Sequence, residues 1–303
     1  MENGRIHIVI VVAALVAVIV GVSFGARSQS QSSTATSTST VKPTVRITEK
    51  ANISTLSPAF VEAAEQNAIL KNDLSWIFGG KQQRGWYLYD PLIRQTLDID
   101  NESPTTDFAA ALSLWQRRTG LPSDGVLNED TMMALISNWQ INRLKNRAPA
   151  TPEQLLTVSA SEFYDSARLP ELRQVERNTY AAYKEMLAAA LADPSLKLEH
   201  TASGELAPEE KYFKIISAFR SRDYQEELRR KSPNAGSAGL AVNSPHFTGR
   251  AMDIYVGGDP VDTNDSNRAI QVNTPAYKWL VQNAPRYGFR PYFYEPWHWE
   301  YVK

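Results

Sequence analysis

The chain has 303 residues, of which 43% are hydrophobic and 21% are charged, and its formal net charge is −1. This length allows one large domain or two ordinary ones. A charge so close to zero argues against a nucleic-acid-binding protein, because phosphates are neutralised by an excess of basic side chains. The chain has no cysteine, so disulfides and thiolate metal sites are excluded, and any metal must be bound by His, Asp or Glu.

The stretch Ile8–Gly25 contains no charged residue. It is just long enough to cross a bilayer and longer than the usual hydrophobic region of a cleaved signal peptide. We therefore expect residues 1–27 to be an uncleaved single-pass anchor. A cleaved signal is the alternative, because Ser23 and Gly25 are small residues at a suitable spacing. Residues 28–56 begin with a run of Ser, Thr and Gln and are expected to form a flexible tether.

Helix signals dominate residues 57–150. The pair Ser57-Pro58 is typical of a helix start, since proline is favoured at the first helical position. Asn128 is placed to cap a later helix. Apolar residues recur at helical spacing in two segments, and these residues are Phe108, Leu112 and Trp115, then Met132, Leu135 and Ile136. We expect a small helical domain.

The segment from Phe108 to Leu135 resembles the second half of the peptidoglycan-binding domain type 1. The shared elements are Trp115-Gln116, Gly120-Leu121, Asp124-Gly125-Val126 and Thr131. This resemblance implies that residues 57–150 bind the cell wall. The alternative is a helical spacer domain without affinity for a ligand.

Residues 151–303 mix helices and short strands without regular alternation, which favours an α+β fold over a doubly wound sheet. Val175–Ala192 is predicted to be a long helix, and Thr274-Pro275 is predicted to start another. The stretch Asp259–Asn273 is rich in Asp and Asn, but it lacks the glycine and glutamate that an EF-hand needs. We expect it to be a polar loop.

Two short pieces near the C-terminus gather the residues that point to chemistry, Ser244–Asp253 and Glu295–His298. A catalytic zinc site takes three nitrogen or oxygen ligands and leaves a fourth position for water. We therefore predict His246, Asp253 and His298 as metal ligands, and Glu295 as the base that takes a proton from water.

Strand periodicity explains how these residues come together. Alternation in 251–256 and in 297–301 leaves Asp253 and His298 on strand faces that can point to the same place. Gly249 allows a tight turn that returns His246 towards Asp253.

The pattern SxHxxGxAxD followed by ExxH resembles the zinc D-alanyl-D-alanine carboxypeptidase family, the VanY-like peptidases. The upstream pieces Ser217-Ala218-Phe219-Arg220-Ser221 and Tyr224-Gln225 match further motifs of this family. The resemblance covers residues 155 to 303. It implies an α+β core in which a small antiparallel sheet with flanking helices carries one zinc ion per chain.

The resemblance also implies a role for each site residue. Three residues match the zinc ligands, Glu295 matches the general base, and Arg220 matches the arginine that steadies the substrate carbonyl or the anionic intermediate. Ser244 and Gln225 match positions that contact the substrate. The three residues that match the ligands are His246, Asp253 and His298.

The sequence thus predicts four parts with boundaries at residues 27, 56 and 150, the last part being the catalytic domain 151–303. The predicted activity is a zinc D,D-carboxypeptidase acting on peptidoglycan stem peptides. The alternatives are an endopeptidase that cuts within the stem peptide or a cross-link, and an inactive wall-binding protein. We expect a single-pass protein of the cell membrane with its catalytic domain outside the cytoplasm, no nucleic-acid partner and no evident protein partner.

Overall fold

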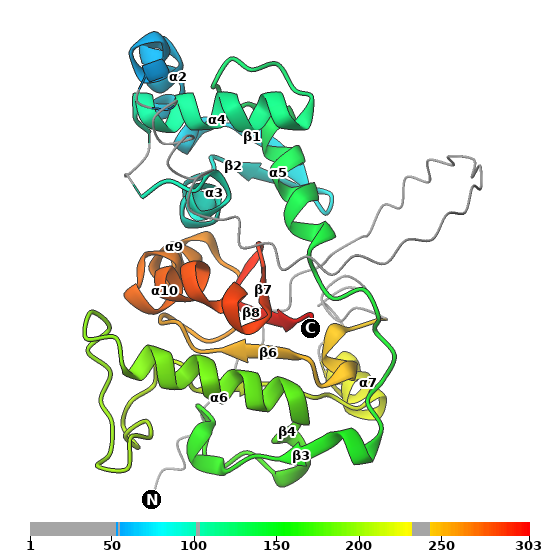
Figure 1. The fold of residues 1–303 in the computed structure, drawn as a ribbon. Coiled ribbons are helices and arrows are strands. Elements are labelled where there is room, and N and C mark those ends of the chain that lie inside the picture. The colour runs from blue at the N-terminus through cyan, green and yellow to red at the C-terminus, as the bar shows by residue number, and fades with distance from the viewer. Residues whose placement is uncertain (1–52, 54, 101–103, 232–242) are drawn as a thin grey trace, which may run out of the picture.

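The computed structural model describes residue 53 and residues 55–100, 104–231 and 243–303. Figure 1 shows a smaller N-terminal half of helices and a hairpin, and a larger C-terminal half in which helices flank a sheet. After the last N-terminal helix, the chain runs down one side of the molecule to the start of the C-terminal half. The expected mixture of helices and a small C-terminal antiparallel sheet is confirmed.

The N-terminal half is helical, as expected, but it also contains a two-stranded hairpin that the sequence reading missed. Its helices and strands are η1 (Ser57–Phe60), α2 (Val61–Asp73), β1 (Ser75–Phe78), β2 (Lys81–Arg84), η2 (Tyr87–Tyr89), α3 (Asp90–Leu97), α4 (Thr106–Thr119) and α5 (Glu129–Ile141). Asn128 caps α5 as predicted, because its side-chain oxygen accepts the Thr131 backbone N–H at 2.9 Å.

The residues that resemble a wall-binding motif have a structural task in this half. Gln116 is buried, and its amide nitrogen donates to Asp124, to Thr131 and to the Val126 carbonyl at 3.0–3.1 Å. Its amide oxygen accepts the Gly125 N–H at 2.9 Å. The motif therefore ties the turn after α4 to the start of α5, and its presence is explained without a ligand.

The C-terminal half is built around a four-stranded antiparallel sheet of order β5-β6-β8-β7. Its sheet strands are β5 (Ile215–Ser217), β6 (Ala251–Ile254), β7 (Phe289–Tyr292) and β8 (Glu295–Tyr301). A separate small pair is formed by β3 (Leu155–Thr157) and β4 (Gln174–Glu176). The helical elements are η3 (Pro152–Gln154), η4 (Ala160–Glu162), η5 (Pro170–Leu172), α6 (Arg177–Leu191), α7 (Arg222–Lys231), η7 (Pro245–Thr248), α9 (Asp265–Asn273), α10 (Pro275–Asn283) and η8 (Ala284–Tyr287).

Two predictions for this half have opposite outcomes. The helix start at Thr274-Pro275 is confirmed, since α10 begins at Pro275 and the Thr274 hydroxyl accepts the Tyr277 N–H at 3.1 Å. The prediction of a polar loop over residues 259–273 is wrong, because residues 265–273 form α9. Tertiary packing decides this helix, since it buries Val272 and the whole side chain of Arg268.

The helices that the structure describes contradict the prediction of a single-pass membrane protein. The longest of them, α6, has 15 residues, whereas a membrane span needs about 20 apolar ones. None of the described helices has the length and apolar character to cross a bilayer. The prediction rested on Ile8–Gly25, and this stretch lies outside the described residues, as does most of the Ser/Thr-rich segment that follows it.

The two halves share one hydrophobic cluster of buried side chains. At their junction, the ring of Phe293 from the β7–β8 turn lies 4.7 Å from that of Phe78, 5.6 Å from that of Tyr89 and 5.9 Å from that of Trp139. Arg268 of α9 donates to the Tyr89 hydroxyl at 2.6 Å. The two halves are therefore packed against each other. The domain boundary at residue 150 stays a prediction.

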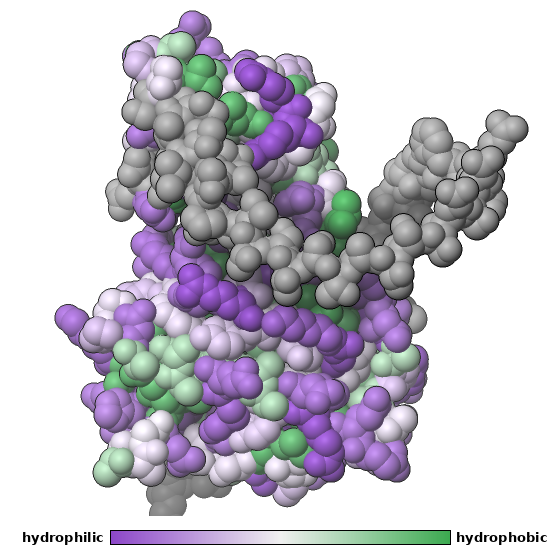
Figure 2. All heavy atoms as spheres, in the orientation of Figure 1, coloured by the Kyte–Doolittle hydropathy of each residue, from purple (hydrophilic) through white to green (hydrophobic). Residues whose placement is uncertain are grey.

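The face drawn in Figure 2 is mainly hydrophilic, with hydrophobic residues scattered in small groups. Several large apolar side chains are exposed singly, which is normal for a protein surface, and they include Val61, Ile69, Ile77 and Ile270. The larger apolar contacts among the described residues are those buried in the cluster that the two halves share.

We predict that Gln116→Ala lowers the free energy of unfolding by about 1–3 kcal/mol, because it leaves buried donors and acceptors without partners. Gln82→Ala is the matched control, since the Gln82 amide nitrogen also donates three hydrogen bonds but the residue is exposed. Its loss is expected to stay within about 0.5 kcal/mol. Urea unfolding of both variants measures the difference, and equal losses would show that the buried Gln116 network stabilises the fold no more than exposed hydrogen bonds do.

Candidate metal centre

The site is assembled by the pairing of two neighbouring strands. In the register of β6 and β8, Asp253 stands directly opposite His298. The His298 Nδ1 atom lies 2.9 Å from one oxygen of Asp253, Oδ1. Both side chains are buried, so this contact is made away from bulk water, where it is strong.

His246 reaches the same carboxylate from the short helix η7. Gly249 ends this helix in the left-handed region with φ 65°, and its N–H donates to the His246 carbonyl. An added Cβ at Gly249 would lie 3.0 Å from the Glu176 backbone nitrogen, so the tight turn needs glycine. The turn brings the His246 Nε2 atom to 3.4 Å from Asp253 Oδ1, which is the approach that the sequence predicted.

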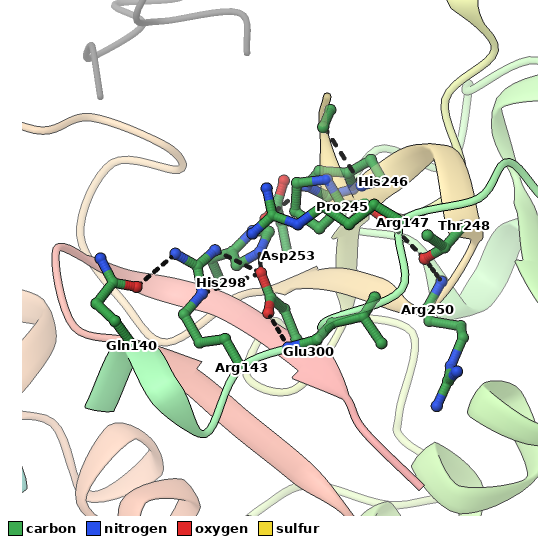
Figure 3. Close-up of polar contacts among 12 residues, drawn as sticks. Gln140, Arg143, Arg147, Pro245, His246, Thr248, Arg250, Asp253, His298 and Glu300 are labelled. Carbon is green, nitrogen blue, oxygen red and sulfur yellow. Dashed lines mark hydrogen bonds and ion pairs between the residues drawn. The ribbon is translucent and has the colours of Figure 1, made fainter. Parts of the chain in front are cut away.

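The second nitrogen of each histidine is also held. His246 Nδ1 lies 2.6 Å from the Ala218 carbonyl oxygen, which can only accept, so Nδ1 carries the proton and Nε2 is left with its lone pair. His298 Nε2 lies 3.3 Å from Glu300 Oε1. Each imidazole therefore offers one nitrogen to the space beside Asp253, and Figure 3 shows the three side chains converging there.

The environment sets different protonation preferences on these groups. Burial, together with the charge of Arg220, lowers the pKa of His246 to about 4. Burial also opposes the charged form of His298, but the hydrogen bonds to Asp253 and Glu300 outweigh it and raise the pKa of His298 to about 9. The two imidazoles outweigh burial at Asp253 and hold the pKa of its carboxyl well below the usual range.

The three side chains fit a divalent metal ion. Their ligand atoms all lie within 4.8 Å of one another. Three ligands on a tetrahedral zinc ion at 2.0–2.1 Å are about 3.3 Å apart, and two of the pairs here are separated by 2.9 and 3.4 Å. Two imidazoles and one carboxylate are also a donor set that zinc accepts.

Arg220 lies beside the cluster. Its Nη2 donates to the other oxygen of Asp253, Oδ2, at 3.1 Å, and its Nε donates to the Ser217 hydroxyl at 3.2 Å. Its side chain is 19% exposed, so Arg220 is not completely closed off from the surroundings. The arginine predicted from the sequence is therefore close to the cluster and held in place by it.

Glu295 is the first residue of β8 and is partly buried. Burial raises the pKa of its carboxyl, the nearby His298 opposes this rise, and the charge of Asp253 adds to it. A carboxyl with a raised pKa is better matched to proton transfer near neutral pH than an exposed one.

The two residues expected to contact substrate are both buried. The Ser244 hydroxyl caps η7 by accepting the His246 N–H at 3.3 Å. Gln225 lies on α7, and its side-chain oxygen is buried with no hydrogen-bond partner among the described residues.

Sequence reasoning gave no role to Glu300 and did not single out Arg143, although both belong to the site. Glu300 shares a strand face with His298, and this alternation is the signal that was available. Arg143 comes from the N-terminal half, 157 residues earlier in the chain, and donates to Glu300. No local pattern indicates such a contact.

Two strands of a small antiparallel sheet carry Asp253 and His298, and the short helix η7 brings His246 beside them, so the three side chains could hold a metal ion. A family model described as VanY, D-alanyl-D-alanine carboxypeptidase, matches residues 173–303. This part of the chain belongs to the VanY-like family, as its motifs suggested, and at the level of the family it is a D-alanyl-D-alanine carboxypeptidase-like peptidoglycan hydrolase. The match does not reach residues 108–135, so their wall-binding resemblance stays a prediction. No curated protein matches the chain.

The pKa values predict the proton balance of metal binding. At pH 7 His298 is protonated because its pKa is raised to about 9, whereas His246, at about 4, is already neutral. Binding of Zn²⁺ through His298 therefore releases about one proton per ion at pH 7, and the affinity rises with pH up to about 9. Calorimetry in buffers of different ionisation enthalpy measures this release. If no proton is released at pH 7, the assignment of His298 as a zinc ligand is contradicted.

Proposed function

We propose that the chain is a zinc D,D-carboxypeptidase that removes the terminal D-alanine from peptidoglycan stem peptides. The observation that carries the proposal is that His246, Asp253 and His298 converge on one point. All three lie in the part of the chain that matches the VanY-like family. These residues would hold one zinc ion per chain. When bound, zinc lowers the pKa of water and polarises the scissile carbonyl.

The chain's own residues would carry the proton and the developing charge. Glu295 accepts a proton from the attacking water and delivers it to the leaving amine, and its raised pKa suits both steps. Arg220 has a permanently charged, planar guanidinium on a partly exposed side chain, and this group would bind the substrate's carbonyl oxygen or terminal carboxylate. Its contact with Asp253 fixes the position of that charge.

The proposal predicts that Glu295→Gln lowers kcat by at least about 10²-fold, the usual contribution of a general base, while zinc is still bound. Glu209→Gln, at an exposed carboxylate of the same half, is the control and should keep full activity. Turnover of a peptide ending in D-alanyl-D-alanine gives kcat, and elemental analysis gives the zinc content. Full activity of Glu295→Gln would remove Glu295 from the mechanism.

Mass spectrometry of digested muropeptides tests the bond that is cleaved. A carboxypeptidase releases single alanines and leaves the rest of the stem peptide intact. Release of longer peptides would instead identify the endopeptidase that the sequence left open. Absence of any cleavage by the zinc-loaded protein would favour the inactive wall-binding alternative.

A further inference from the structure

Both nitrogens of the His298 ring have a partner. The partner of the second nitrogen contacts residues that lie outside the family match at 173–303. Its Nδ1 faces Asp253, and its Nε2 lies 3.3 Å from Glu300 Oε1. A histidine that binds a metal through one nitrogen is oriented by the partner of the other nitrogen. Glu300 is the partner of the His298 nitrogen that faces away from Asp253.

Glu300 is fully buried, and each of its oxygens has a donor. Oε1 faces His298 Nε2 and accepts from the Nε of Arg143 at 3.1 Å and from its Nη2 in a shorter contact. Oε2 accepts the Leu144 backbone N–H at 2.9 Å. A buried carboxylate is tolerated only with such partners, and two of the three residues that supply them lie in the segment after α5.

Arg143 is itself held on several sides, as Figure 3 shows in part. Its Nη1 donates to the Gln140 side-chain oxygen at 2.9 Å. Its guanidinium carbon lies 4.0 Å from the centre of the Tyr292 ring, a cation–π contact. Tyr292 in turn packs edge-on against the His298 ring, with 6.0 Å between the centroids. The arginine is thus a fixed donor rather than a mobile surface charge.

The N-terminal half also holds the turn that precedes Glu295. In that turn, the rings of Phe293 and Tyr294 lie 4.7 and 5.7 Å from Phe78 of β1. Strand β8 is therefore fixed from the N-terminal half at two places, by this aromatic contact at its start and by Arg143 at Glu300. Glu295 and His298 both lie on this strand.

We propose that the N-terminal half is a part of the metal centre, in which Arg143 positions His298 through Glu300. The inference rests on the proposed function in one respect, that a metal binds His298 through Nδ1. Arg143 and Leu144 lie outside the family match at 173–303, so this support comes from the part of the chain that the match does not cover. The N-terminal half then sets the affinity of the site for its metal.

Zinc affinity of the full chain tests this directly, measured by competition with a chelator of known affinity. Arg143→Gln and Glu300→Gln should each raise the dissociation constant for Zn²⁺ about 10–100-fold, the usual effect of losing an outer partner of a metal ligand. Arg143→Lys should fall in between, because lysine keeps the charge but loses the two-pronged contact.

The matched control is Arg94→Gln. Arg94 pairs with Asp90 within the N-terminal half, and its side chain is 17% exposed, compared with 12% for Arg143. This variant loses a comparable ion pair that does not touch the site, so it should bind zinc within about twofold of the unchanged chain. A general loss of stability would instead weaken zinc binding equally in Arg94→Gln and Arg143→Gln, and that result would overturn the inference.

A second readout uses the metal-free protein. Nitrogen NMR of the imidazoles should show changed His298 signals in Arg143→Gln and Glu300→Gln and unchanged His246 signals, because only His298 contacts Glu300. Unchanged His298 signals together with unchanged zinc affinity would overturn the role of Arg143. An unchanged chain that binds no zinc would refute the proposed metal site itself, which is a different outcome from a failure of the arginine.

Discussion

The site depends on the contacts that the carboxylate of Asp253 makes. One of its oxygens faces an imidazole from each of two segments, and the other accepts from Arg220. A buried charge without partners destabilises a protein by several kcal/mol, so this carboxylate requires all three groups around it. The strands β6 and β8, the helix η7 and the segment before α7 are thereby drawn to one point.

The register of β6 and β8 brings the partners of Asp253 together. Because Asp253 stands opposite His298, the two side chains meet on the same face of the sheet, and a slip of one residue would separate them. The same alternation along β8 places Glu300 on this face, where it reaches the far nitrogen of His298. The N-terminal half then closes this chain of contacts through Arg143, so packing at the junction and geometry at the site are linked.

Much of the site could be predicted from sequence because its signals are local. Capping side chains mark the starts of α5 and α10, and strand alternation with Gly249 explains how His246, Asp253 and His298 meet. The sequence does not reveal features that depend on distant partners. Helix α9 forms where Asp and Asn suggested a loop, since its buried Arg268 is held by Tyr89, and the contact of Arg143 with Glu300 joins segments that no spacing relates.

The most direct test of the account is a crystal structure of the zinc-soaked protein with an anomalous difference map at the zinc edge. We expect one strong peak about 2.0–2.2 Å from His246 Nε2, an oxygen of Asp253 and His298 Nδ1, the distances that zinc takes to such ligands. A peak elsewhere in the chain, or one bound through the Nε2 atom of His298, would contradict the central claim.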